Sequence, residues 1–326
     1  MRVRRLIRFS IRSTQRFEGL RFDTASENRL QVMAEILVSV IIPTFNRSSQ
    51  IVDCLEELAK QMSPYDDVEV IVVDNGSKDD TKQAVGVFIE RNGGDIKYVL
   101  EETPGVNSAR NRGRTVASGK AIALLDDDAI PRPKWLELTR EYFLNGEGDC
   151  FAGRVEVGPS VMVPAWLPPE MYSILGKSFY GAHDRKLNAN EYPQSGNCAF
   201  TAEMFDDVGG FNPRSILYGD ETEFFQRARE KGYSFEYRHA IVIDHCPAAD
   251  RLTEEAVLEK GYAWGKGSAV NWLLTTPSSF ERTKRILEFS TRTIYIATRK
   301  RMSPSFSREY TYRHCSGHLA QLVKGL

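Results

Sequence analysis

The chain has 326 residues, of which 41% are hydrophobic and 27% are charged. This composition is typical of a globular protein and excludes a wholly disordered chain. Lys and Arg number 43 and Asp and Glu number 44, so the net charge of −1 provides no overall field that would favour nucleic acid.

The first segment in chain order is a basic N-terminal arm, residues 1–36. Its first 21 residues contain seven arginines and one acidic residue, Glu18. Apolar residues lie between the arginines and make the arm weakly amphipathic, which is compatible with contact to an anionic membrane surface. A disordered or mis-started N-terminus is an equal alternative. The arm lacks the continuous apolar core and the small-residue cleavage site of a secretory signal.

The five cysteines are odd in number and scattered, and no two have C-x-x-C spacing. This pattern argues against a disulfide framework and a zinc site, and it favours a reducing compartment. No apolar run reaches the length needed to cross a bilayer. We therefore expect a cytoplasmic protein, with a peripheral contact at the inner face of the cell membrane as an open alternative.

From residue 37 the chain alternates predicted strands and helices. Apolar, β-branched runs predict the strands, and helical spacing of apolar residues predicts the segments between them. The strands are expected at 38–42, 68–73, 96–100 and 121–125, and the helices at 51–62, 81–90 and 107–117. Nearly continuous apolar strands separated by helices predict a mostly parallel α/β sheet covered on both faces.

Polar residues cap three of these strands. The three groups are Thr44, Asn46 and Arg47; Asp74, Asn75 and Ser77; and Asp126, Asp127 and Asp128. In such sheets ligands bind beyond the carboxyl ends of the strands. Three successive carboxylates at the end of a buried strand repel one another, and a divalent cation is the simplest group that offsets their charge. The pattern predicts Mg²⁺ or Mn²⁺ beside a nucleotide diphosphate, whereas an isolated Asp-Asp-Asp would more simply be a solvated turn.

The second half is less regular. It begins with a Pro-rich loop at 159–169 and a polar excursion at 176–194, which we expect to be a lid or acceptor loop. A short strand near 195–200, a helix at 219–231 and a strand-like run at 233–244 that ends at His245 follow. From Thr253 onwards helices are expected, broken around Pro277 and Pro304.

Five motifs in this order and spacing resemble a family 2 glycosyltransferase of the GT-A fold. They are Ile42–Arg47, Val72–Asp79, Gly105–Gly113, Leu125–Pro131 and Tyr218–Arg227. The resemblance implies a GT-A (Rossmann-like) domain at 37–248. The basic arm and the C-terminal helical extension, expected at 249–326, fall outside it. It implies an inverting enzyme that moves a sugar from a nucleotide-diphosphate sugar to an acceptor hydroxyl. By family habit alone the donor is a UDP-sugar, and GDP- and dTDP-sugars stay open. The acceptor is a glycan, a lipid-linked saccharide or another cell-surface polysaccharide precursor, with a protein acceptor also open.

The resemblance also implies a metal site for Mn²⁺ or Mg²⁺. The family's D-x-D motif falls on Asp126 and Asp128, so that Asp128 contacts the metal and Asp126 lies near the ribose or a metal-bound water. Some relatives use a histidine near the position of His245 as a further metal or diphosphate contact; a structural role is the alternative. The ion would stabilise charge on the leaving diphosphate.

The donor pocket follows from the same motifs. Its implied residues are Pro43, Thr44, Asn46, Arg47, Asp74, Asn75, Arg110, Asn111, Asp126 and Asp127. Asp74 takes the family's nucleobase position, although Asp-Asn-Gly-Ser is also favourable turn chemistry. Arg47 could equally begin the next helix as a solvated residue. Arg110 lies one turn into a helix whose N-terminus should face the site, and both features favour anions.

The acceptor hydroxyl needs a general base. The family places a carboxylate pair at the start of the helix that here begins Gly219-Asp220-Glu221, and its second member is the base. The role falls on Glu221, where Asp is commoner, with Asp220 as the alternative. Taken alone, two acids at a helix start would only complement its dipole.

Other classes of protein fit less well. A nicotinamide-dependent enzyme would need G-x-G-x-x-G after the first strand, and Pro43–Arg47 does not supply it. A phosphotransferase with an Asp nucleophile would leave the motifs around Pro43 and Asp74 unexplained. A catalytically degenerate sugar-nucleotide-binding module is the main alternative, although a pure binder needs no base.

Overall fold

The computed structural model describes residues 35–214, 220–275, 277–302 and 305–325. The basic arm predicted at residues 1–36 lies almost entirely outside the described residues, and its membrane contact stays a prediction. Ala34–Leu326 form one compact unit, so the predicted boundary between residues 248 and 249 also stays a prediction.

The first half of the sheet is parallel. Its strands lie in the order β3-β2-β1-β4 and are β1 (Val38–Thr44), β2 (Val68–Asp74), β3 (Ile96–Leu100) and β4 (Ala121–Leu125). The connecting helices are α1 (Ser48–Met62), α2 (Thr81–Asn92) and α3 (Val106–Val116). β1, β2 and β4 are buried along their whole length, as expected of strands covered on both faces. The predicted elements of this region are confirmed to within a few residues.

The second half of the sheet is mixed and continues from β4 as β8-β6-β9-β5. These strands are β5 (Ala129–Pro131), β6 (Cys150–Val157), β8 (Asn197–Thr201) and β9 (Glu236–His245), with β7 (Arg185–Lys186) paired to β9. β8 runs antiparallel to β4 and to β6, and β5 and β7 run antiparallel to β9. β6 and β9 run parallel to each other. The mostly parallel arrangement therefore holds for β1–β4, whereas long irregular connections bring the later strands back in either direction.

Helices cover both faces of the sheet. Along β1, Val40 and Ile42 pack into a core with α1, α2 and α4 (Trp135–Leu144). The intervening Ile41 packs on the other face, in an aromatic-rich core with α3, α5 (Ala202–Val208) and α6 (Asp220–Glu230). This alternation is the period of two that a strand imposes on its side chains.

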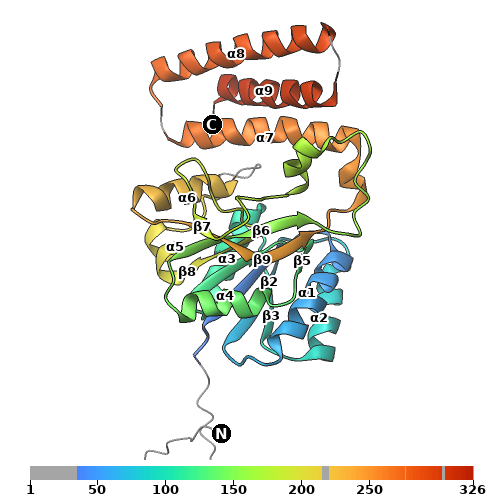
Figure 1. Cartoon of the computed structure of the whole chain (residues 1–326), viewed down its shortest axis with the longest axis vertical. Helices are drawn as coiled ribbons and strands as arrows, with labels where there is room; N and C mark the ends of the chain where they lie inside the picture. The colour runs from blue at the N-terminus through green and yellow to red at the C-terminus, as the bar shows by residue number, and fades with distance from the viewer. Residues whose placement is uncertain (1–34, 215–219, 276, 303–304, 326) are drawn as a thin grey trace, which may run out of the picture. The chain divides into compact units, whose positions relative to one another are not determined.

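Three helices follow two short 3₁₀ segments, η1 (Pro169–Leu175) and η2 (Ala249–Leu252). They are α7 (Glu254–Leu274), α8 (Ser279–Met302) and α9 (Phe306–Lys324), and they lie together beyond the sheet with α9 between α7 and α8 (Figure 1). The backbones of α7 and α9 touch: a Cβ added to Gly265 would lie 1.9 Å from the carbonyl oxygen of His314. Only glycine permits that approach.

Among the described helices, none combines the length and the apolar character that a membrane-crossing segment requires.

Candidate active site

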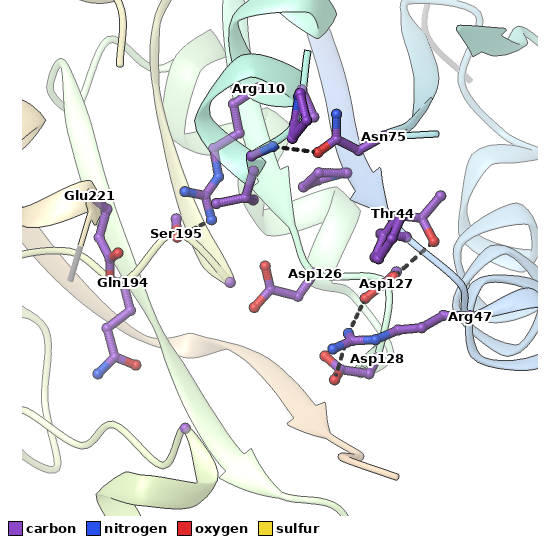
Figure 2. Close-up of a pocket in the computed structure, with 18 of the residues that line it drawn as sticks. Thr44, Arg47, Asn75, Arg110, Asp126, Asp127, Asp128, Gln194, Ser195 and Glu221 are labelled. Atoms are coloured by element: carbon purple, nitrogen blue, oxygen red, sulfur yellow. Dashed lines mark hydrogen bonds and ion pairs between the residues drawn. The ribbon is translucent and has the colours of Figure 1, made fainter. Parts of the chain in front are cut away.

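One large cavity, about 1490 Å³ in volume, opens at the carboxyl ends of β1, β2 and β4. The three groups of polar residues predicted at these strand ends all contribute to its wall. The first turn of α6 and one side of α7 line it as well. The side chains around its centre come from both halves of the sheet (Figure 2). The three strand-end groups therefore meet at one cavity.

Asp127 holds the end of β4 to the end of β1. It accepts a hydrogen bond from the Thr44 hydroxyl at 2.8 Å, and Arg47 Nη1 pairs with its other oxygen (Figure 2). Burial raises the pKa of Asp127 to about 6, although the charge of Arg47 opposes the shift. Arg47 is thus fixed by carboxylates at the cavity wall, which excludes the alternative of a solvated helix residue.

Asp128 is the most heavily paired carboxylate of the three. Its Oδ2 lies 2.9 Å from Arg47 Nη1 and 2.8 Å from Arg251 Nη1, and its Oδ1 lies 3.2 Å from His245 Nε2. Burial alone would raise the pKa of Asp128, but the hydrogen bond with His245 and the two arginines hold it well below its ordinary value.

His245 ends β9 and is buried beside Asp128. Its Nδ1 lies 2.6 Å from the carbonyl oxygen of Leu175, which can only accept, so Nδ1 carries a hydrogen and Nε2 faces Asp128. Burial lowers the pKa of His245, but the adjacent Asp128 outweighs this and raises it above its ordinary value. Both ring nitrogens thus face oxygen acceptors, and the Leu175 carbonyl fixes the ring orientation, as carbonyl partners do for metal-binding histidines.

Asp126 points into the cavity between Ser195 and the other two carboxylates (Figure 2). Its carboxylate passes close to Gly196, where an added Cβ would lie 2.6 Å from Oδ2. Burial, together with the charge of Asp128, raises the pKa of Asp126. On the neighbouring wall Arg110 is buried and donates to the Ser195 hydroxyl at 2.6 Å.

The predicted metal set Asp126, Asp128 and His245 is not assembled as a ready-made site. Within the described residues, no group of three or more His, Cys, Asp and Glu side chains is placed to hold a metal ion. The physical reason lies in the charges: Asp128 already faces Arg47 and Arg251, and Asp126 lies on the side of Gly196.

Asp74 ends β2, where it closes the predicted turn and also lines the cavity. Its Oδ1 accepts the backbone N–H of Ser77 at 2.8 Å, which closes the predicted turn, and its Oδ2 accepts the Tyr98 hydroxyl at 2.7 Å. The same side chain lines the cavity. Asn75 beside it binds backbone groups of the β3–α3 loop, including the N–H of Gly105 at 2.7 Å, and so fixes the loop that leads into α3.

Two predicted donor contacts, Asn46 and Asn111, are absent from the cavity wall. Asn46 has a positive φ of 53° and accepts the backbone N–H of Lys78 at 2.7 Å. Asn111 exchanges two hydrogen bonds with the backbone of Phe211, at 2.8 and 2.9 Å. The Asn46 side chain thus holds the loop that carries the wall residue Lys78, whereas Asn111 holds backbone away from the wall. The predicted Pro43 and Arg110 do lie at the wall.

Glu221 enters the cavity from the first turn of α6, across from the Asp126–Asp128 cluster and next to Gln194 (Figure 2). An ion pair between Glu223 and Arg227, 2.6 Å long, and a bond from Arg227 to the carbonyl oxygen of Gly210 hold this helix in place. Asp220 begins α6, but its side chain lies outside the described part of the chain.

Sequence reasoning missed several wall residues. Arg251, Ser195 and Gly196 carry no local signal, because each acquires its role from a partner distant in sequence. A second group recurs every fourth residue along α7 and faces the cavity as one stripe: Lys260, Trp264, Ser268 and Trp272. Burial and the charge of Arg251 lower the pKa of Lys260 to about 8. The helical spacing of this stripe was the signal that could have revealed it.

Comparison with known proteins identifies the family. Residues 39–209 match the family described as "Glycosyl transferase family 2". The chain belongs to this family. It is 30% identical to glycosyltransferase AglE of Haloferax volcanii over 73% of this chain and 74% of that protein. It is 26% identical to the glucosyl-dolichyl phosphate glucuronosyltransferase of the same organism, over 56% of this chain and 58% of that protein.

Solved structures agree on the fold. S. aureus TarS 1-349 in complex with UDP-GlcNAc superposes with a TM-score of 0.53 at 19% identity, covering 70% of this chain and 65% of that one. The mannosyltransferase PcManGT from Pyrobaculum calidifontis, in complex with GDP-Man and Mn²⁺, gives 0.52 at 18% identity, covering 88% and 73%. The chain is thus a family 2 glycosyltransferase with a GT-A fold, which confirms the predicted fold and enzyme class.

Proposed function

We propose that this glycosyltransferase moves a sugar from a nucleoside-diphosphate sugar to an acceptor hydroxyl of a glycan or lipid-linked saccharide, by a single displacement that inverts the anomeric centre. The observation that carries the proposal is the convergence of Asp74, the Asp126–Asp128 cluster and Glu221 on one cavity. These groups would supply what the reaction needs: a contact to the nucleobase, an anchor for the diphosphate and an acceptor for the proton of the acceptor hydroxyl.

The donor would lie along the strand ends, with its nucleobase near Asp74 and its diphosphate near Asp126 and Asp128. Arg47, Arg110 and Arg251 surround the diphosphate end and would offset its charge. The complexes of TarS with UDP-GlcNAc and of PcManGT with GDP-Man support a nucleotide-sugar donor. We retain UDP as the expected nucleotide on the basis of family habit.

A divalent ion, Mn²⁺ or Mg²⁺, suits the residue types present. Asp126 and Asp128 offer hard oxygen ligands, and the Leu175 carbonyl orients the His245 ring so that Nε2 points toward Asp128. When bound, the ion would stabilise negative charge on the leaving diphosphate. The Mn²⁺ complex of PcManGT supports this choice of cofactor.

The acceptor would enter between α6 and α7. Trp264 and Trp272 bring aromatic surfaces to that wall, and Lys260, Ser268 and Asn271 add polar groups. Apolar rings with a few polar groups are the usual lining of a ligand site. The second H. volcanii relative is named as a glucosyl-dolichyl phosphate glucuronosyltransferase, which supports a lipid-linked acceptor here.

Glu221 is the proposed general base. From the start of α6 it would take the proton of the acceptor hydroxyl as that oxygen attacks the anomeric carbon opposite the leaving diphosphate. Arg227 and Glu223 position the helix that carries it. Asp220 remains the alternative base.

The test replaces Glu221 with Gln, which keeps size and hydrogen bonding but removes basicity. Glu221→Gln should bind donor normally and lose transfer by a factor of about 100 or more, as expected for general base catalysis. The matched control is Glu230→Gln at the exposed far end of the same helix. Transfer would be followed with a panel of glycan and lipid-linked acceptors, and the anomeric configuration of the product by NMR.

Three outcomes would change the proposal. If Asp220→Asn is inactive while Glu221→Gln is active, the base is Asp220. If the product retains the donor's configuration, single displacement is wrong. If the wild-type chain binds donors but neither transfers nor hydrolyses any of them, the degenerate binding module replaces the enzyme.

A further inference from the structure

The outward face of α8 exposes apolar side chains that nothing in the described chain covers. Five of them are between 60% and 77% exposed: Phe280, Leu287, Ile294, Tyr295 and Met302. Phe280, Leu287 and Ile294 are seven residues apart, as are Tyr295 and Met302, so all five lie on one side of the helix. They extend over about 33 Å at the helical rise of about 1.5 Å per residue.

The opposite side of α8 accounts for its place in the fold. Phe289 stacks on the His318 ring of α9 with ring centroids 3.7 Å apart, and Ile286 packs beside Leu322. Arg285 lies over the Trp272 ring of α7, 4.8 Å from its centroid. The helix therefore keeps its position through its inner side, and α8 is the outermost of the three helices (Figure 1).

The outward face is also basic. α8 contains seven Lys and Arg residues and two acids, Glu281 and Glu288. Four of the basic residues are exposed beside or within the apolar row: Lys284, Arg292, Arg299 and Arg301. Apolar side chains flanked by Lys and Arg are the pattern of a helix that lies in the surface of an anionic bilayer.

We propose that the outward face of α8, defined by these five apolar and four basic residues, docks on an anionic membrane surface. The helix lies in the plane of the interface, with the apolar row entering the headgroup region and the basic side chains contacting lipid phosphates. The inference is independent of the proposed donor, metal and base, because it concerns a surface remote from the Asp126–Asp128 cluster.

A second copy of the chain is a less suitable occupant. A coiled-coil seam needs apolar residues three or four positions after each of Phe280, Leu287 and Ile294. The exposed residues there are all polar: Thr283, Lys284, Thr291 and Thr298. Two copies paired through this face would also bring their basic residues together, whereas anionic lipid offsets that charge.

The test is co-sedimentation of the full chain with vesicles of phosphatidylglycerol and phosphatidylcholine. The triple variant Phe280→Gln, Leu287→Gln, Ile294→Gln should bind these vesicles at least about 1000-fold more weakly than wild type, since each buried side chain contributes about tenfold or more. The matched control is Val87→Gln, Leu144→Gln, Met162→Gln, three exposed apolar residues outside α8. The N-terminal arm is unchanged in every variant, so its own contribution cancels.

A charge variant separates the electrostatic part. Arg299→Gln with Arg301→Gln should weaken vesicle binding about 25-fold, roughly fivefold for each charge near an anionic surface. Arg91→Gln with Lys186→Gln, both exposed on the catalytic unit, is the control. Wild-type binding should fall in about 1 M salt, where the screening length is about 3 Å, and on pure phosphatidylcholine.

Circular dichroism and nucleotide release from donor sugars verify that each variant folds. If the apolar triple binds vesicles as wild type does, the proposal is wrong. If wild type sediments as a dimer that the triple variant dissociates, while vesicle binding is unchanged, the face joins two protomers and the proposal is overturned.

Discussion

The strand-end half of the cavity and its α7 half are built in different ways. The first is made of short motifs that each follow a buried strand, so that Thr44, Asp74 and Asp126 meet because parallel strands end at one edge. The second is one stripe on a helix, placed by the contact of α7 with α9 at Gly265. Local sequence therefore specifies the residues of the strand-end wall, whereas tertiary packing of α7 on α9 places the opposite wall.

Substitutions at the two walls should therefore have different effects. Changes at the strand ends should abolish donor chemistry while the fold survives. Changes behind α7 should act through stability and the position of the opposite wall.

The largest expected effect is at Asp128. Asp128→Asn should abolish manganese-dependent binding of the nucleoside diphosphate and reduce transfer by about 10³-fold, equivalent to about 4 kcal/mol of lost charge stabilisation. Titration of the nucleotide with and without Mn²⁺ measures it, and Asp53→Asn at an exposed position of α1 is the control. Full activity of Asp128→Asn in the presence of a chelator would show that the D-x-D assignment is wrong.

An intermediate effect is expected at the α7–α9 contact. Gly265→Ala places a methyl group against the His314 backbone, so the helices must separate, at a cost of about 1–3 kcal/mol in the free energy of unfolding. Gly86→Ala within α2 meets no atom within 4 Å and should instead stabilise by about 0.5–1 kcal/mol. Urea unfolding compares the two. Equal stability of both variants would show that α7 and α9 are not held by backbone contact.

The Gly265→Ala variant also tests the proposed acceptor wall. Because the stripe on α7 moves with its helix, this variant should raise the KM for acceptor more than the Kd for donor. A matched loss of donor affinity would place α7 at the donor instead.

The smallest effect is expected at Asp74. Asp74→Ala should weaken donor binding by about tenfold and reduce discrimination among nucleobases, since it removes one charged hydrogen-bond partner. Calorimetric titration with UDP, GDP and dTDP measures both quantities. Asp80→Ala, exposed at the start of α2, is the control. Unchanged affinity and preference would leave Asp74 as a turn residue that holds Ser77 and Tyr98.

The alternation of apolar runs with helical spacing was enough to predict β1–β4, the helices between them and the edge where ligands bind. The strands of the second half were harder to predict, because β5, β6 and β7 are short or lie among irregular loops and pair with strands distant in sequence. The periodicity of apolar residues within a segment does not indicate which distant strand it pairs with. For the same reason Asn46 and Asn111 were predicted at the cavity wall, although their amides bind loop backbone instead.

The sequence by itself determined the family, the sheet edge that carries the site and the carboxylates at that edge, because each depends on residues close together along the chain. The tertiary structure alone decided that Arg47, Arg251 and His245 all converge on Asp128, with separations of more than 100 residues for two of those contacts. It also decided that a stripe of α7 faces the same cavity. Charge pairing and helix packing act through space, and no local pattern specifies which distant segment will supply the partner.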